Sequence, residues 1–222
     1  MFDLHPNVLA ALTGFISGIL LSVPVGPINL TIVNEGARRG FSWAVLIALG
    51  AISADLIYCT LAFTGFASFF QKGLVKAAME LTSFVFLLYL GIRFLKAKSI
   101  VATNKIEERI EEKLHPHSAF MIGFVRVIGN PGILLLWIII AANFISREWV
   151  EPEGSSRLSC IFGVAMGAGL WFLSLSYAVS RGHKKFTDKT LLRLEHFSGI
   201  GLITLALIHG GRIIWQMAKH KM

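Results

Sequence analysis

The sequence predicts an all-α integral membrane protein with six transmembrane helices, arranged as two inverted three-helix repeats whose first and fourth helices are broken. The first observation is composition. The 222 residues are 55% hydrophobic and only 15% charged, whereas soluble domains are about a quarter charged. The second is that six apolar stretches reach the roughly 20 residues that a helix needs to cross a bilayer. The third is a proline inside both the first and the fourth stretch. The stretches lie near residues 8–33, 41–66, 74–95, 118–145, 158–180 and 196–217.

The chain divides into three parts around its longest polar segment. These parts are residues 1–95, a first three-helix repeat; 96–117, a cytoplasmic linker; and 118–222, a second three-helix repeat. In the linker, Asn104 and Glu107 form a capping-box pattern. Ile106, Ile110 and Leu114 then fall on one helical face. The pattern predicts a short amphipathic helix, which either lies along the inner membrane surface or forms a solvated linker.

The two halves carry matching interruptions. "SVPVGP" interrupts the first apolar stretch and "VRVIGNPG" the fourth, with Pro27 and Pro131 close to half the chain length apart. Because each half has an odd number of spans, the second half enters the membrane upside down relative to the first. Inverted repeats with corresponding Gly/Pro interruptions indicate a transporter binding site.

The formal net charge of +8 comes from an excess of basic residues, and these residues are unevenly distributed along the chain. Of the 21 Lys and Arg residues, thirteen fall on one predicted face of the membrane and seven on the other, with Arg126 inside a span. Because basic loops are retained in the cytoplasm, loops 34–40, 96–117 and 181–195 are predicted to be cytoplasmic and both termini to lie outside. The charge is a topology signal, so we expect a lipid bilayer and no nucleic acid as partner.

Small residues recur at helix-packing spacing. The pairs are Gly14 with Gly18 and Gly163 with Gly167. Such GxxxG pairs let helix backbones approach closely, and we expect them to pack within one chain, with the interface of a homodimer as the alternative. Cys59 and Cys160 lie inside predicted spans and are interpreted as small core residues rather than as a disulfide.

The two breaks are candidate binding elements. A broken helix leaves unpaired carbonyls on one side and unpaired N–H groups on the other, which hydrocarbon does not tolerate unless protein or a wet cavity receives them. A half-helix N-terminus also attracts a carboxylate. With the halves inverted, Gly26 and Pro27 should meet Asn130 and Pro131 at a similar depth, and Asn29 follows inside the membrane. We predict a substrate site at these five residues; a packing kink without ligand is the alternative.

Two charged residues lie inside predicted spans. Asp55 is far from either end of its span, and an intramembrane acid indicates a functional site. It could hold a substrate amine or carry the proton that drives transport, or it could make a structural hydrogen bond or ion pair. Arg126 could bind a substrate carboxylate, pair with Asp55, or extend its side chain to the cytoplasmic surface.

Other chemistry is not predicted. Trp137, Trp171 and Tyr58 are candidate cavity-lining residues, although interfacial or core packing is commoner for aromatic side chains. The sequence lacks HExxH, GxSxG and Walker motifs. The spans also offer few metal ligands besides Asp55 and two scattered cysteines. We therefore expect no enzyme, no metal site and no cofactor.

Several segments resemble the LysE/RhtB-type amino-acid exporters. They are "GFISGILLSVPVGPINLTIVNEGARRGFSWAVLIALGAISADLIYCTLAFTGFASFF", "GFVRVIGNPGILLLW" and "SGIGLITLALIHGGRII". The resemblance is strong over the first 70 residues and thinner beyond. The family pattern falls on Gly26, Pro27, Asp55, Asn130 and Pro131. Two features depart from it: P-V-G-P replaces the P-G-P of many members, and Arg126 stands where an apolar or small residue is expected.

The resemblance implies a six-helix exporter that moves amino acids or related metabolites out of a bacterial cytoplasm, driven by an ion gradient. The leading hypothesis is a proton-coupled exporter of a small zwitterion in the bacterial inner membrane. The substrate carboxylate would face the half-helix ends, and Asp55 would handle the amine or the proton. The alternatives are a cation or metal exporter of the same superfamily and a membrane scaffold that transports nothing.

Overall fold

The computed structural model describes residues 5–24, 26–65, 73–97, 118–151, 154–182 and 188–219. All regular secondary structure in these residues is α-helical, so the predicted all-α class is confirmed. The helices are α1 (Pro6–Ser22), α2 (Pro27–Arg39), α3 (Phe41–Gly65), α4 (Gly73–Leu95), α6 (Ala119–Ile128), α7 (Pro131–Ser146), α8 (Ser155–Gly182) and α9 (Asp188–Lys219). The amphipathic linker helix predicted around Asn104 lies outside the described residues.

Two helices are broken where the prolines were expected to break them. α1 and α2 are bent by 71° at their junction, and α6 and α7 by 66°. Pro27 and Pro131 each begin the second half-helix, a position at which the missing N–H removes no intrahelical hydrogen bond. Among the described residues, α3 and α8 are each long and apolar enough to cross a membrane, and counting each bent pair as one span raises this number to four.

The helices reach further into the predicted cytoplasmic loops than expected. α2 continues to Arg39, so that Gly40 alone separates it from α3. Gly40 has a φ of 89°, which a residue with a Cβ rarely adopts. Glu35 makes ion pairs with Arg38 and Arg39 one turn along, an arrangement that stabilises a polar helix end. The predicted loop 34–40 is therefore a helical extension and a single-residue turn, and the loop between α8 and α9 is shortened in the same way.

Glycines mediate the closest helix pairings. α1 packs along α8, α6 along α3, and α4 along α9. A Cβ on Gly14 would overlap the carbonyl oxygen of Cys160, and one on Gly163 would overlap that of Ala11. The GxxxG pairs thus pack within one chain, as predicted. Cys59 and Cys160 are free and fully buried, which confirms them as small core residues.

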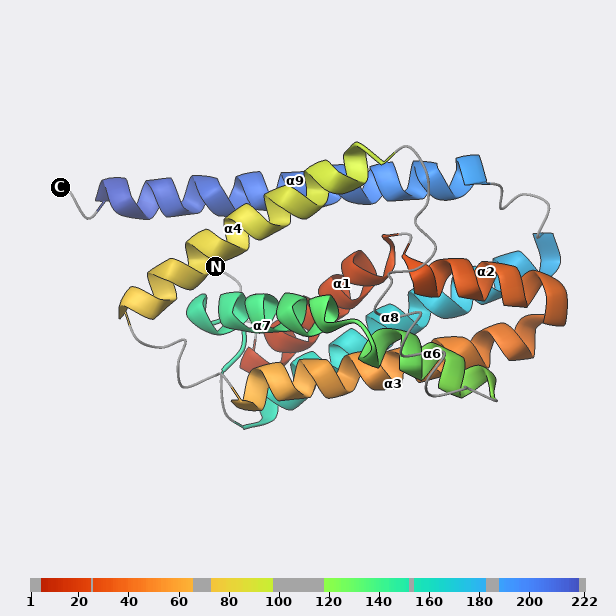
Figure 1. Cartoon of the computed structure of the whole chain (residues 1–222). Helices are drawn as coiled ribbons and strands as arrows, with labels where there is room; N and C mark the ends of the chain where they lie inside the picture. Colours follow the sequence, from red (N-terminus) through yellow and green to blue (C-terminus); the bar gives the residue numbers. More distant parts are fainter. Residues whose placement is uncertain are drawn as a thin grey trace.

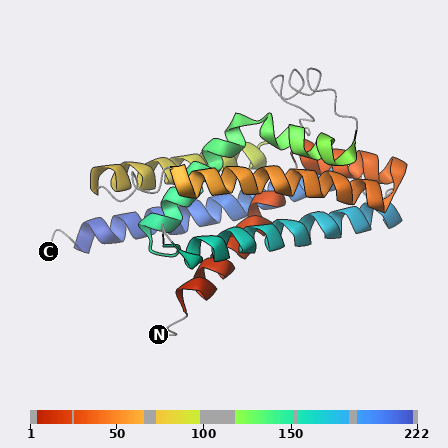
Figure 2. The same cartoon turned by 90° about the horizontal axis from the view of Figure 1, so that it is seen from below.

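The outer surface is apolar and the interior is rich in small residues. Figure 1 shows α4 and α9 together on one side of the other helices, and Figure 2 shows α3 and α8 running alongside each other. Outward-facing side chains include Phe162, which is 66% exposed, and Phe197, which is 71% exposed. Alanines such as Ala51 and Ala54 are fully buried. This distribution is typical of helices that pack against one another inside a bilayer.

Candidate functional site

A cavity of about 130 Å³ lies where the two broken spans meet. Most of the predicted site residues line it: Gly26, Pro27, Asn29, Asp55, Arg126 and Asn130. Pro131 follows Asn130 directly as the first residue of α7. Much of the remaining wall is apolar, with contributions from Leu21, Ile133, Leu136 and Phe172. The structure therefore brings the predicted residues to one place, while their role in binding a substrate stays a prediction.

Asn29 closes the first break from inside α2. Its side-chain amide donates to the carbonyl oxygens of Ser22 at 2.9 Å and Pro24 at 2.7 Å. Its amide oxygen accepts a hydrogen bond from the indole N–H of Trp171 on α8 at 3.0 Å. The carbonyls that the break frees at the end of α1 are thus satisfied by protein. Asn29 is 3% exposed, so its amide first of all holds the break in shape.

The beginning of α2 is open toward the cavity. Gly26 is its N-cap residue and has no side chain that could accept a capping hydrogen bond. A Cβ at Gly26 would meet nothing within 4 Å. Its φ of −104° is accessible to any residue, so the backbone does not require glycine. The effect of the glycine is that its own side chain does not cap the first N–H groups of α2.

The second break is closed by two other side chains. The side-chain oxygen of Asn130 accepts a hydrogen bond from the backbone N–H of Gly132 at 3.0 Å, which caps α7. The hydroxyl of Tyr58 on α3 donates to the carbonyl oxygen of Ile128 at 2.6 Å. The carbonyl of Ile128, the last of α6, is therefore bonded by a side chain of the neighbouring helix α3 and not by one of its own broken span.

Asp55 lies on α3 and faces the cavity. Its Oδ1 accepts a hydrogen bond from the indole N–H of Trp137 on α7 at 3.0 Å, and Trp137 is 2% exposed. The carboxylate is thereby held at the junction between a continuous helix and the second half-helix of a broken span. A single indole N–H leaves further lone pairs of the carboxylate able to accept other donors.

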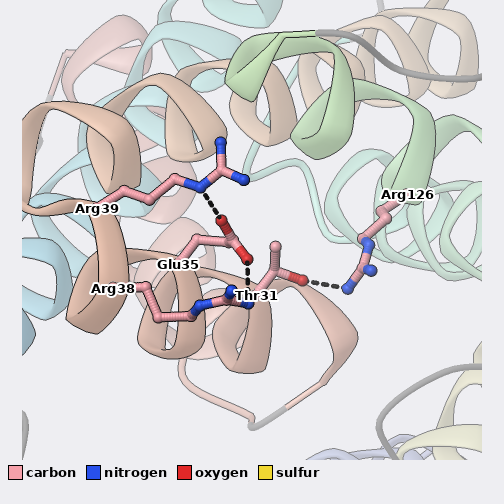
Figure 3. A network of polar contacts seen from close by, with 5 residues as sticks. All are labelled: Thr31, Glu35, Arg38, Arg39 and Arg126. Carbon is pink, nitrogen blue, oxygen red and sulfur yellow. Dashed lines mark hydrogen bonds and ion pairs between the residues drawn. The ribbon is translucent and has the colours of Figure 1, made fainter.

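Arg126 reaches from α6 to α2. Its guanidinium donates to the hydroxyl oxygen of Thr31 and lies 3.5 Å from the carbonyl oxygen of Pro27. Thr31 in turn donates its hydroxyl hydrogen to the same carbonyl at 2.6 Å. Figure 3 shows Arg126 approaching Thr31 from one side, with the Glu35 ion pairs one turn further along α2. Arg126 thus joins the two breaks through groups of α2, and its binding of a substrate carboxylate stays a prediction.

Sequence reasoning missed Thr31. Its signal is its position four residues after Pro27, where a threonine hydroxyl can bond the carbonyl one turn back. Trp137, Trp171 and Tyr58 were recognised as candidates, but their individual partners were not predicted. Within the described part of the chain, no three His, Cys, Asp or Glu residues come together in a group that could hold a metal ion.

Comparisons with known proteins agree with one another. The model of the family described as LysE type translocator matches residues 19–209. A Bacillus subtilis (strain 168) protein named "Putative amino acid efflux protein YcgF" is 26% identical over 207 residues, covering 93% of this chain and 97% of that protein. The arginine exporter protein ArgO of Shigella flexneri is 28% identical over 166 residues, covering 73% of this chain and 74% of that protein. No solved structure gives a significant match.

Proposed function

The chain belongs to the LysE type translocator family, and on that premise we propose that it exports amino acids or related small zwitterionic metabolites across the bacterial inner membrane. The relatives support this substrate class, because their names are those of an amino acid efflux protein and of arginine exporters. Transport by a family of integral membrane proteins also agrees with the apolar outer faces of the helices.

The observation that carries the proposal is the cavity at the two helix breaks. Among the described residues, its lining includes the acidic side chain of Asp55 and the basic side chain of Arg126. Charged residues inside membrane spans are costly and mark substrate or ion pathways. Binding sites formed by discontinuous helices are a recurring design of secondary transporters. A zwitterion would place its amine at Asp55 and its carboxylate near Arg126 and the open start of α2.

We propose that Asp55 also couples export to the proton gradient. A coupled exporter needs a group that gains and loses a proton during its cycle, and an acid at membrane depth is a natural candidate. Trp137 holds the carboxylate at the cavity wall, where both substrate and proton can reach it. Protonation of Asp55 would weaken its hold on the amine and so favour release of the substrate.

We further propose six spans in two inverted repeats, with both termini outside. Support comes from the packing partners: exchanging α1 with α6 and α3 with α8 turns the α1–α8 pair into the α6–α3 pair. The distribution of basic residues supports the orientation. Cysteine labelling tests it. After Glu108→Cys, a membrane-impermeant thiol reagent should label the protein in opened cells but not in intact ones, whereas labelling of intact cells would refute the orientation.

The transport proposal is tested by measuring a panel of metabolites. Cells with and without the protein are loaded with amino acids, and the appearance of each one outside is followed over time. Divalent metal ions belong in the same panel, because a cation exporter is the competing hypothesis. We expect faster efflux of one or more amino acids in cells that contain the protein. Faster efflux of metal ions alone, or no change for any compound, would refute the proposal.

A further inference from the structure

We infer that the cavity selects amino acids with a short aliphatic side chain, and that Ile133 and Leu136 of α7 are the specificity-determining residues. This inference rests on the proposed function, because it names the kind of side chain that the same cavity accepts. It is carried by the apolar lining of the cavity, by the hydrogen bonds of its polar side chains and by its size.

The position of the ammonium group determines where a substrate side chain begins, because both are attached to the same carbon of an amino acid. Under the proposed function the ammonium group lies at Asp55, whose carboxylate is bonded by Trp137 of α7. Ile133 lies one turn before Trp137 and Leu136 directly before it, and both line the cavity. Residues at spacings of three and four share one face of a helix. The substrate side chain therefore begins beside this face of α7.

Three other helices add apolar surface to the same cavity. Leu21 of α1, Ile28 of α2 and Phe172 of α8 line it together with the α7 face, and Phe172 is only 3% exposed. An aliphatic side chain that moves from water onto such surface gains free energy through the hydrophobic effect. The lining thus favours a substrate whose side chain is a hydrocarbon.

The polar side chains of the lining are engaged in maintaining the protein. Asn29 uses both hydrogens of its amide for carbonyls at the first break. Trp137 uses its indole N–H for Asp55, and Asn130 accepts from the backbone of α7. Ser22 is 7% exposed and offers little surface to a ligand. A hydroxyl or amide on the substrate side chain would have to compete with these hydrogen bonds, and a buried polar group without a partner is costly.

The size of the cavity limits the length of the side chain. Its volume is about 130 Å³. An apolar cavity of roughly 150 Å³ holds a molecule the size of benzene, whereas sites for drug-sized ligands begin at about 300 Å³. A whole amino acid has to fit, so that the space for its side chain is small. Valine suits this space better than phenylalanine does.

The test uses the purified full-length protein in proteoliposomes and measures transport of radiolabelled valine, threonine, phenylalanine and arginine. Valine and threonine have nearly the same shape and differ by a methyl group against a hydroxyl. For the wild type we expect valine to move at least about tenfold faster than threonine. Valine should exceed phenylalanine by a similar factor, because overfilling a packed site is unfavourable.

A first pair of variants tests the polarity of the wall. Ile133→Thr places a hydroxyl on the wall with little change in size, and we expect it to raise the ratio of threonine to valine transport about fivefold. Ile57→Thr makes the same chemical change on α3 at a position that is 43% exposed and does not line the cavity. It should leave the ratio at the wild-type value.

A second pair tests the size of the cavity. Leu136→Ala removes most of a side chain from the wall, and we expect it to raise the ratio of phenylalanine to valine transport about tenfold. Leu135→Ala is the matched control, because Leu135 is the preceding residue of α7 and is 58% exposed. It should not change the ratio.

Two kinds of outcome would overturn the inference and leave the proposed function intact. The first is wild-type transport of threonine, phenylalanine or arginine as fast as that of valine, a comparison that needs no variant and decides the point even if a variant does not fold. The second is a ratio in Ile133→Thr or Leu136→Ala no higher than in its control. If none of the four amino acids moves, the proposed function fails and the inference fails with it.

Discussion

At the two helix breaks, different side chains bond the backbone carbonyls that each break leaves without a helical partner. At the first break, Asn29 bonds the free carbonyls of Ser22 and Pro24 from within α2, and Trp171 holds the asparagine in place. At the second break, the hydroxyl of Tyr58 on α3 bonds the free carbonyl of Ile128. Both arrangements remove the cost of unpaired carbonyls at membrane depth. The side chain that bonds the free carbonyls comes from the same span at the first break and from a neighbouring helix at the second.

The N-terminal ends of the two half-helices differ more. α7 is capped by the side chain of Asn130, whereas α2 begins at Gly26 with no side-chain cap. The donors of α7 are therefore partly occupied by the residue before the helix, whereas the residue before α2 occupies none. Arg126 adds its positive charge beside α2 as well. Under the proposed function, the first break would receive the carboxylate of a substrate, while Asp55, held by Trp137 of α7, would receive the amine or the proton.

The largest effect is expected for Asp55→Asn, which keeps the shape of the side chain and removes its titration. We expect a folded, membrane-inserted protein whose gradient-driven export falls by roughly a hundredfold or more. Substrate binding should weaken by about 1.5–3 kcal/mol if Asp55 holds the amine. Export is measured in proteoliposomes with and without an imposed proton gradient. Glu148→Gln, an exposed site, is the control, and wild-type export in Asp55→Asn would leave Asp55 a structural acid.

The next largest effect separates the two asparagines at the breaks, of which Asn29 bonds free carbonyls and Asn130 caps a helix. Asn29→Ala leaves the carbonyls of Ser22 and Pro24 without their donor and Trp171 without its acceptor, so we expect a loss of about 3 kcal/mol in the free energy of unfolding. Asn130→Ala removes the cap of α7 and should cost about 1 kcal/mol. Equilibrium unfolding in mixed detergent micelles measures both variants. Equal losses would contradict the distinction between the breaks.

A smaller effect is expected when the first break is made to resemble the second. Gly26→Asn introduces a capping side chain at the start of α2, where space is open. Stability should change by only a few tenths of a kcal/mol. Export should fall by roughly tenfold, because the new side chain competes with the substrate for the N–H groups of α2. Initial efflux rates decide the point, and unchanged export would show that these donors do not contribute to binding.

The smallest effect concerns the hydrogen bond that Tyr58 of α3 donates to the second break. Tyr58→Phe removes the hydroxyl that bonds Ile128 and should lower the free energy of unfolding by about 1 kcal/mol. Tyr177→Phe provides the same chemical change at a half-exposed site, where we expect less than about 0.5 kcal/mol. A Tyr58→Phe variant as stable as Tyr177→Phe would argue that the second break does not need α3.

Much of the architecture could be predicted because it depends on local chemistry. Apolar length indicated helices, and the prolines marked both breaks, since proline cannot continue a helix through its interior. The isolated acid in an apolar stretch marked Asp55 as a site residue. Helix ends were predicted less well. α2 runs through residues 34–39, which were expected to form a loop, because the ion pairs of Glu35 with Arg38 and Arg39 support polar turns that hydropathy does not detect.

The sequence by itself determined the helical class, the positions of the two breaks and the presence of opposite charges in the spans. Only the tertiary structure decided which groups meet. Trp137 binds Asp55 across 82 residues, and Arg126 reaches Thr31 across 95 residues. Such pairings depend on how each helix is rotated and tilted against its neighbours, which is set by the packing of many small residues together. No local pattern around Asp55 or Arg126 carries that information, so their partners emerge only when the whole bundle is assembled.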